Sequence, residues 1–165
     1  MRVLGVDPGT FRMGVGVLDS EDGRLKLVHT GVLRARRGES LDRRLHHLYE
    51  ELLGVISKWR PGVVAVEEPF VANNVRAALA VGQAQAVAMV AAARHDIEVQ
   101  GYSPREVKLA VTDHGGSAKE QVQEMVRVLL DLPADWKEPS DASDALAVAI
   151  CHANAAGSPL TVIEE

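Results

Sequence analysis

The stretch Val3-Leu4-Gly5-Val6-Asp7-Pro8-Gly9-Thr10 decides the fold that the rest of the chain must fit. It has the apolar composition of a buried strand, and its Pro-Gly pair marks a turn directly after Asp7. An ionised carboxylate at the end of a buried strand is costly unless a metal ion or hydrogen bonds compensate its charge. A single acid before a turn is more often a turn or capping residue, so Asp7 indicates a functional site only with partners.

Two further segments carry acids at comparable places. The apolar run Val63-Val64-Ala65-Val66 ends at Glu67, and Asp141 and Asp144 stand at the mouth of an apolar helix. Residues three apart share one face of a helix, although Asp141 could also be a first-turn acid favoured by the helix dipole. If the first strand and the strand ending at Glu67 are parallel neighbours, their acids emerge together at the carboxyl edge of the sheet.

Four carboxylates at one place repel each other, so some stay protonated or cations bind. Ligands that are all oxygen suit Mg²⁺, with Mn²⁺ as a substitute, and the sequence shows no convergent His and Cys set for zinc. Two such ions about 3.5–4 Å apart activate a water and stabilise the leaving oxygen in phosphodiester cleavage. The four acids together therefore indicate a candidate metal site for this kind of hydrolysis.

The length of 165 residues fits one domain, and the formal net charge of −5 argues, taken alone, against a nucleic-acid partner. Four of the acids belong to the candidate site, however, so local basic groups must decide. The single Cys151 excludes an internal disulfide and fits a reducing cytoplasm. A strand occupies the place of a signal peptide, and we interpret the Ala-rich stretch 77–93 as a buried helix rather than a membrane span.

Hydrophobic periodicity predicts three meander strands followed by alternating helices and strands, which is a mixed α/β plan. A capping box, Ser117-Ala118-Lys119-Glu120, is expected to open one of the helices. Besides the first strand, the predicted elements are strands at 13–19, 25–33, 63–67 and 97–102 and helices at 40–59, 73–94, 104–111, 117–130 and 140–155.

Three motifs resemble the RuvC family of Holliday-junction resolvases. They are Gly5-Val6-Asp7-Pro8-Gly9-Thr10, the run from Val64 to Phe70, and the run from Asp141 to His152. The resemblance implies a ribonuclease-H-like α/β fold, with a mixed five-stranded sheet flanked by helices. It also implies a cytoplasmic homodimer that resolves four-way DNA junctions by paired, Mg²⁺-dependent nicking in recombination and repair. We expect a nuclease domain over residues 1–155 and a flexible tail over 156–165.

The resemblance also assigns roles to particular residues. It implies that Asp7, Glu67, Asp141 and Asp144 bind metal, all four being catalytic together with Lys119 near the scissile phosphate. Family resemblance alone suggests the branch-migration proteins RuvA and RuvB as partners. The residues expected to contact DNA are Phe70, which would stack on bases, Asn73 in the loop that follows it, Arg76, Lys108 and Lys119.

Three other interpretations stay open at this point. The Asp7-Pro8-Gly9-Thr10 turn also resembles the phosphate loop of actin-like ATPases and sugar kinases, which bind nucleotide between two such domains. The other two are a non-cleaving nucleic-acid module and a related nuclease acting on another nucleic acid, such as RNA.

For the homodimer we expect close backbone approach along the small residues Ala80, Ala84, Ala88 and Ala92, with burial on the protein's own sheet as the alternative.

Overall fold

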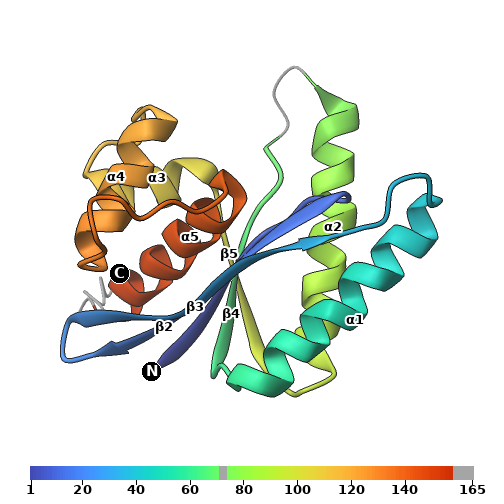
Figure 1. Cartoon of the computed structure of the whole chain (residues 1–165), viewed down its shortest axis with the longest axis horizontal. Helices are drawn as coiled ribbons and strands as arrows, with labels where there is room; N and C mark the ends of the chain where they lie inside the picture. Colours follow the sequence, from blue (N-terminus) through green and yellow to red (C-terminus); the bar gives the residue numbers. More distant parts are fainter. Residues whose placement is uncertain (71–73, 158–165) are drawn as a thin grey trace, which may run out of the picture.

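The computed structural model describes residues 1–70 and 74–157. One mixed sheet has the strand order β3-β2-β1-β4-β5 (Figure 1). β2 pairs antiparallel with both β1 and β3, whereas β4 pairs parallel with both β1 and β5. The predicted mixed five-stranded sheet is thereby confirmed. The strands are β1 (Arg2–Asp7), β2 (Arg12–Glu21), β3 (Arg24–Arg34), β4 (Val63–Glu67) and β5 (Glu98–Tyr102).

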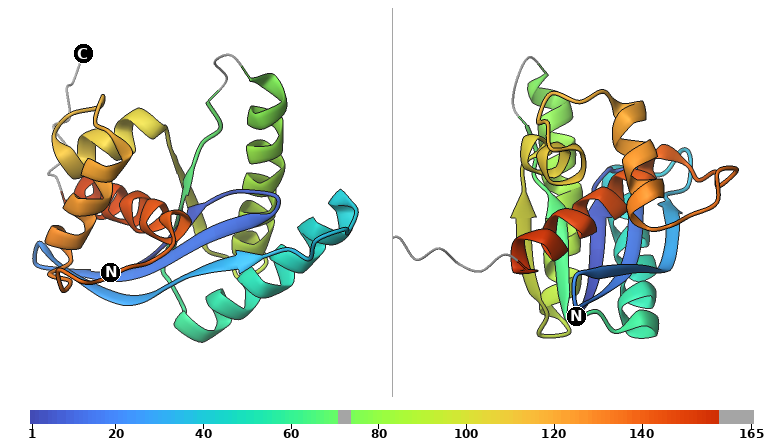
Figure 2. Two further views of the ribbon diagram at one scale, coloured as in Figure 1. Left: turned by 45° about the horizontal axis from the view of Figure 1, so that its top comes forward. Right: turned by 90° about the vertical axis from the view of Figure 1, so that its left-hand side faces the viewer.

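Helices cover both faces of this sheet, as Figures 1 and 2 show from three sides. The helices α1 (Leu41–Trp59) and α2 (Val75–Ala93) lie on one face. The helices α3 (Pro104–Thr112), α4 (Lys119–Leu129) and α5 (Ser140–Gly157) lie on the other. Residues 158–165 are outside the described part of the chain, so the division into a domain over 1–155 and a tail over 156–165 stays a prediction.

The alternation of the two central strands decides where the acids point. In β1, Val3 packs in the core beneath α5, whereas Leu4 and Val6 pack in the core beneath α1 and α2. β4 alternates in the same way, with Ala65 on the α5 side. Because successive side chains of a strand point to opposite faces, the acids that end both strands share the α5 face. The register pairs Val6 with Val66, so the two acids that follow are neighbours.

Glycines let α5 cross the sheet at backbone contact. A Cβ on Gly5 would collide with the carbonyl oxygen of Ala145, and one on Gly14 with the carbonyl oxygen of Asp141. A methyl group at either position would therefore have to push the helix away from the sheet. Because α5 lies this close, its first turn sits directly above the carboxyl end of β1.

The capping box expected at Ser117 is absent. Helix α4 begins after Ala118 without a side-chain cap, because the Ser117 hydroxyl is used by Thr112 and by the carbonyl of His114. A capping box opens α3 instead, between Ser103 and Glu106.

The Ala-rich helix α2 is long and apolar enough to cross a membrane, but it packs one face on the protein's own sheet. That face contains Ala84, Ala88 and Ala92, all fully buried within the chain. Ala80, the fourth alanine of the predicted row, is partly exposed, but the other three leave no surface for a second copy, so the dimer face predicted along the row was wrong. The small side chains serve close packing of the helix on its own sheet.

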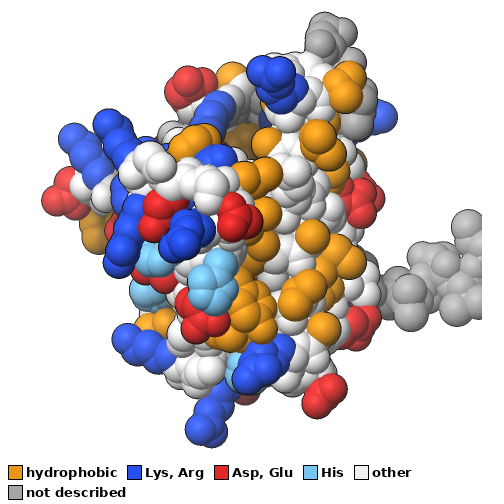
Figure 3. All heavy atoms as spheres, turned by 90° about the vertical axis from the view of Figure 1, so that its right-hand side faces the viewer, with side chains coloured by type: hydrophobic (Ala, Val, Ile, Leu, Met, Phe, Trp, Pro, Cys, Tyr) orange, Lys and Arg blue, Asp and Glu red, His pale blue; other side chains and the backbone are white. Residues whose placement is uncertain are grey.

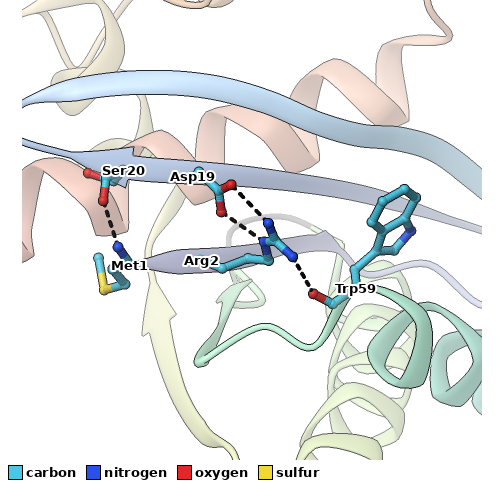
Figure 4. A network of polar contacts seen from close by, with 5 residues as sticks. All are labelled: Met1, Arg2, Asp19, Ser20 and Trp59. Atoms are coloured by element: carbon cyan, nitrogen blue, oxygen red, sulfur yellow. Dashed lines mark hydrogen bonds and ion pairs between the residues drawn. The ribbon is translucent and has the colours of Figure 1, made fainter.

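The opposite end of β1 is held by a polar network far from the acids (Figure 4). The Arg2 guanidinium donates to both carboxylate oxygens of Asp19 at 2.8 and 2.9 Å and to the Trp59 carbonyl at 3.0 Å. The terminal amine of Met1 donates to the Ser20 carbonyl at 2.6 Å. The network joins β1 to β2 and to the end of α1, so it anchors the first strand away from the candidate site.

Candidate active site

The four acids predicted from the sequence come together at one edge of the sheet. Asp7 and Glu67 are the last residues of β1 and β4, and Asp141 and Asp144 lie in the first turns of α5. All four are half-buried, between the sheet edge and the helix above it. Glu68 points elsewhere, because its side chain lies over Gly101 on β5. The strand alternation therefore selects Glu67 rather than Glu68 for the cluster.

The electrostatics of the cluster reflect crowded negative charge. Burial, followed by the charges of Glu67, Asp144 and Asp141, raises the pKa of Asp7 to about 8. Burial and the charge of Asp144 raise the pKa of Glu67, although a hydrogen bond with Asp7 acts in the opposite direction. Burial also raises the pKa of Asp144, against the effect of Lys119. A cluster of this kind binds protons or cations in preference to remaining fully ionised.

Two cations already pair with the acids of α5. Lys119 Nζ lies 2.6 Å from Asp144 Oδ2, and Arg12 Nη2 lies 2.6 Å from Asp141 Oδ2. Burial lowers the pKa of Lys119, but its hydrogen bond to Asp144 and the neighbouring carboxylates more than offset this effect. Arg12 was not among the residues predicted from sequence. Only the strand pairing could have identified it. Asp7 pairs with Gly14 in antiparallel register, so the start of β2, where Arg12 lies, runs beside the acids.

The donor set fits a divalent ion in its chemistry, since all four ligands are carboxylates with neighbouring negative charge. As the side chains lie, no group of three or more His, Cys, Asp or Glu within residues 1–70 and 74–157 is arranged to hold a metal ion. The ion pairs explain this arrangement, because Asp141 and Asp144 each have an oxygen directed at a cation. Metal binding at these two oxygens would require Arg12 and Lys119 to release them.

A cleft with a volume of about 260 Å³ opens beside the acids. Glu67 and Asp144 line one side, and Lys108 and Lys119 line another. The charge of Lys108 lowers the pKa of Glu67, which places the two charges in one electrostatic environment. The structure thus brings both predicted lysines to the acids, from α3 and from the start of α4.

Phe70 and Arg76, two further predicted DNA contacts, do not line this cleft. Phe70 is 71% exposed, so it is not the ordinary core phenylalanine that its side chain alone would suggest. Arg76 is exposed in the first turn of α2, and no ion pair within 4 Å is found for it among the described residues. Asn73 lies outside the described residues, so its predicted contact stays a prediction.

Comparison with known proteins agrees with this arrangement. The sequence pattern of the family described as "Crossover junction endodeoxyribonuclease RuvC" matches residues 3–152. A protein of that name from Dehalococcoides mccartyi is 48% identical over 152 residues, covering 92% of each chain. Another from Chloroflexus aggregans is 49% identical over 153 residues, covering 93% of each chain.

Solved structures give the same result. The structure of Thermus thermophilus RuvC in complex with Holliday junction substrate superposes with a TM-score of 0.86 at 37% identity, covering 94% of each chain. The predicted ribonuclease-H-like α/β fold is confirmed by this superposition. The match over nearly the whole chain also favours a resolvase over the alternative of an actin-like nucleotide-binding domain. The chain therefore belongs to the RuvC family of crossover junction endodeoxyribonucleases.

Proposed function

We propose that this chain resolves four-way DNA junctions by metal-dependent phosphodiester hydrolysis at Asp7, Glu67, Asp141 and Asp144. The observation that carries the proposal is the convergence of these four acids from three distant segments, where burial and the charges of the other three acids raise the pKa of Asp7 to about 8. Such a crowded site lowers the stability of the folded chain. This is expected where residues are selected for catalysis rather than for stability. The family membership gives the substrate class.

The four carboxylates would hold Mg²⁺, with Mn²⁺ as a substitute, and two ions per site fit a cluster of this charge. The bound ions would activate the attacking water and stabilise the leaving oxygen. The chain's own residues would orient the scissile phosphate. Lys119 lies on the cleft wall beside Asp144, where an ammonium can stabilise the charge that develops on the phosphate. Lys108 on the same wall is suited to bind a neighbouring phosphate.

Single-turnover cleavage in Mg²⁺, with binding measured separately in Ca²⁺, tests this assignment. For Asp7→Asn, Glu67→Gln, Asp141→Asn and Asp144→Asn we expect cleavage to fall at least about a hundredfold, the scale for losing one transition-state stabiliser. Binding of a synthetic four-way junction should survive. Asp135→Asn, in the exposed loop before α5, is the matched control and should cut normally. Near wild-type cleavage by all four variants would refute the assignment.

The same assay addresses the substrate. We expect four-way junctions to be cut in preference to a linear duplex and to an RNA–DNA hybrid of the same sequence. Preferential cleavage of the hybrid would instead support the alternative of a related nuclease that acts on another nucleic acid. Because the family membership rests on residues 3–152 and not on the four acids alone, this comparison tests the substrate separately from the role of the acids.

A homodimer is the second part of the proposal, on a different face of α2 from the alanine row. The exposed side of α2 carries Leu79 and Val90, which are 62% and 58% exposed. With Leu45 and Tyr49 of α1, Val90 borders an apolar groove with a volume of about 340 Å³. Figure 3 shows apolar side chains gathered on the side of the molecule formed by α1 and α2. A continuous apolar surface of this kind favours burial against a second copy.

Sedimentation at micromolar concentration tests this face. We expect the chain to sediment as a dimer and the double variant Leu79→Arg with Val90→Arg to sediment as a folded monomer. Val128→Arg, on the exposed side of α4, introduces a similar charge on another surface and should remain dimeric. A dimeric double variant would exclude this face, and a monomeric wild-type protein would exclude the dimer.

We further propose, from the family resemblance alone, a cytoplasmic location and contacts with the branch-migration proteins RuvA and RuvB. Their effect on cleavage of a junction, measured with each protein added separately, tests the contacts. Fractionation of cells that express the chain tests the location.

A further inference from the structure

A dense group of arginines lies on the side of the site opposite the two lysines. The segment from Arg34 to Arg44 contains five arginines and two acids, Glu39 and Asp42, so it carries +3 (5 − 2) within a chain of net −5. We call its arginines the basic segment: Arg34, Arg36, Arg37, Arg43 and Arg44. It comprises the end of β3, the connection to α1 and the first turn of α1.

Four of the five arginines of the basic segment are exposed and not neutralised by an ion pair within the described part of the chain, whereas Arg44 is half-buried against Phe11. Arg34, Arg36, Arg37 and Arg43 are exposed. Among the described residues none of the five makes an ion pair within 4 Å. Of the two acids in the segment, only Asp42 is exposed, and it lies next to Arg43 in the chain. Figure 3 shows Lys and Arg side chains gathered on one side of the apolar surface formed by α1 and α2.

Strand pairing ties the basic segment to the active site. Arg34 pairs in register with Arg12, whose guanidinium contacts Asp141. The Ala35 amide donates to the Phe11 carbonyl at 3.0 Å, and the Arg44 guanidinium stacks on the Phe11 ring with Cζ 3.7 Å from its centroid. The basic segment is thus held against the turn that follows Asp7. In Figures 1 and 2 this connection and helices α3 and α4 lie on opposite sides of the end of β1.

We propose that the basic segment, together with Arg12, is a second phosphate-binding surface that holds the backbone of one arm of the DNA junction. This proposal rests on the proposed function, because it assumes that DNA reaches the acids. Negative DNA needs cations beyond Lys108 and Lys119 to approach four carboxylates in an acidic chain, and phosphate contacts supply most sequence-independent affinity. Arginines without ion-pair partners beside the acids meet that need. Binding of DNA here would also offer Arg12 a phosphate when Asp141 turns to a metal ion.

The test is the salt dependence of junction binding in Ca²⁺, measured by fluorescence anisotropy. The triple variant Arg36→Gln, Arg37→Gln, Arg43→Gln removes three charges that make no ion pair within 4 Å in the described structure, so folding should be unaffected. Each phosphate contact contributes about 0.9 to the slope of log affinity against log salt. We expect the slope to become shallower by about 2 and Kd at about 0.1 M salt to rise at least about tenfold.

Two matched variants complete the design. Arg24→Gln, Lys26→Gln, Arg94→Gln removes the same charge from exposed positions at the other end of the sheet and should keep the wild-type slope. The triple variant Arg36→Lys, Arg37→Lys, Arg43→Lys should keep the wild-type slope, since the charge is kept. Equal weakening by both glutamine triples, or no weakening by either, would overturn the proposal. So would a change in sedimentation of the first triple, which would assign the segment to contact between copies. Failure of the proposed function would look different, because wild-type protein would then bind no junction.

Discussion

The cost of the acidic cluster should be measurable as stability that is lost as pH rises. The pKa of Asp7 is about 8 in the folded chain and 3.8 for the unperturbed group. Between these values the folded chain retains a proton that the unfolded chain releases. Stability therefore falls as pH rises through this window and becomes constant above about 8. Asparagine has the same shape without the charge, so Asp7→Asn should remove this dependence.

The structure sets the magnitude. One pKa unit corresponds to about 1.4 kcal/mol, so the interval from pH 5 to pH 8 allows a loss of up to about 4 kcal/mol. The opposing charge of Lys119 is already included in the pKa of about 8, so no further reduction applies. In EDTA, Asp7→Asn should be more stable than wild type. This gain should be larger at pH 8 than at pH 5, by up to about 4 kcal/mol.

Urea unfolding in EDTA at pH 5 and pH 8 measures this difference. Asp19→Asn is a control of opposite sign, because the hydrogen bonds from Arg2 hold the pKa of Asp19 below its ordinary value. That variant should lose stability, by up to about 1 kcal/mol, at both pH values. Mn²⁺ should stabilise the wild-type chain at pH 8 and stabilise Asp7→Asn much less. Parallel pH dependence in wild type and Asp7→Asn would refute the crowded-charge argument.

Three further predictions concern single residues. Lys119→Ala should reduce the single-turnover cleavage rate of bound junction at least about tenfold, and an unchanged rate would make Lys119 a phosphate anchor only. Phe70→Ala should weaken junction binding by about 1–3 kcal/mol without changing thermal stability, since a stacking aromatic is lost from an exposed position. Gly14→Ala should cost about 2–3 kcal/mol of stability, because the added methyl meets the Asp141 carbonyl, whereas Gly54→Ala in open space on α1 should not destabilise.

Strand-end chemistry made much of the site predictable from the sequence. A buried run that ends in an acid has a fixed alternation, so the position of Asp7 follows once β1 is recognised. The same holds for Glu67, which points to the α5 face of the sheet, whereas Glu68 does not. The helix period likewise places Asp141 and Asp144 on one face of α5. Local periodicity carries this information. The long-range assumptions were the parallel pairing of β1 with β4 and the docking of α5 on the carboxyl edge of the sheet.

Contacts between segments could not be predicted in the same way. Arg12 reaches Asp141 because β2 returns antiparallel beside β1, and a one-residue change of register would turn its side chain to the other face. The alanine row of α2 has the same sequence pattern whether it packs on a sheet or on another helix. Exposure decides between these possibilities, and it places Leu79 rather than Ala84 at the surface.

The two ion pairs at α5 connect the stability of the chain to its chemistry. A cluster of four carboxylates with no compensating cation would repel α5 from the sheet, although Gly5 and Gly14 allow the closest approach there. Arg12 and Lys119 supply that compensation from opposite sides, one from β2 and one from α4. Both are half-exposed and singly paired with acids, so a divalent ion can replace them at a modest cost of about 1 kcal/mol each. Once displaced, each cation would lie at the rim of the cluster. There it could bind a phosphate of the DNA substrate of the proposed reaction.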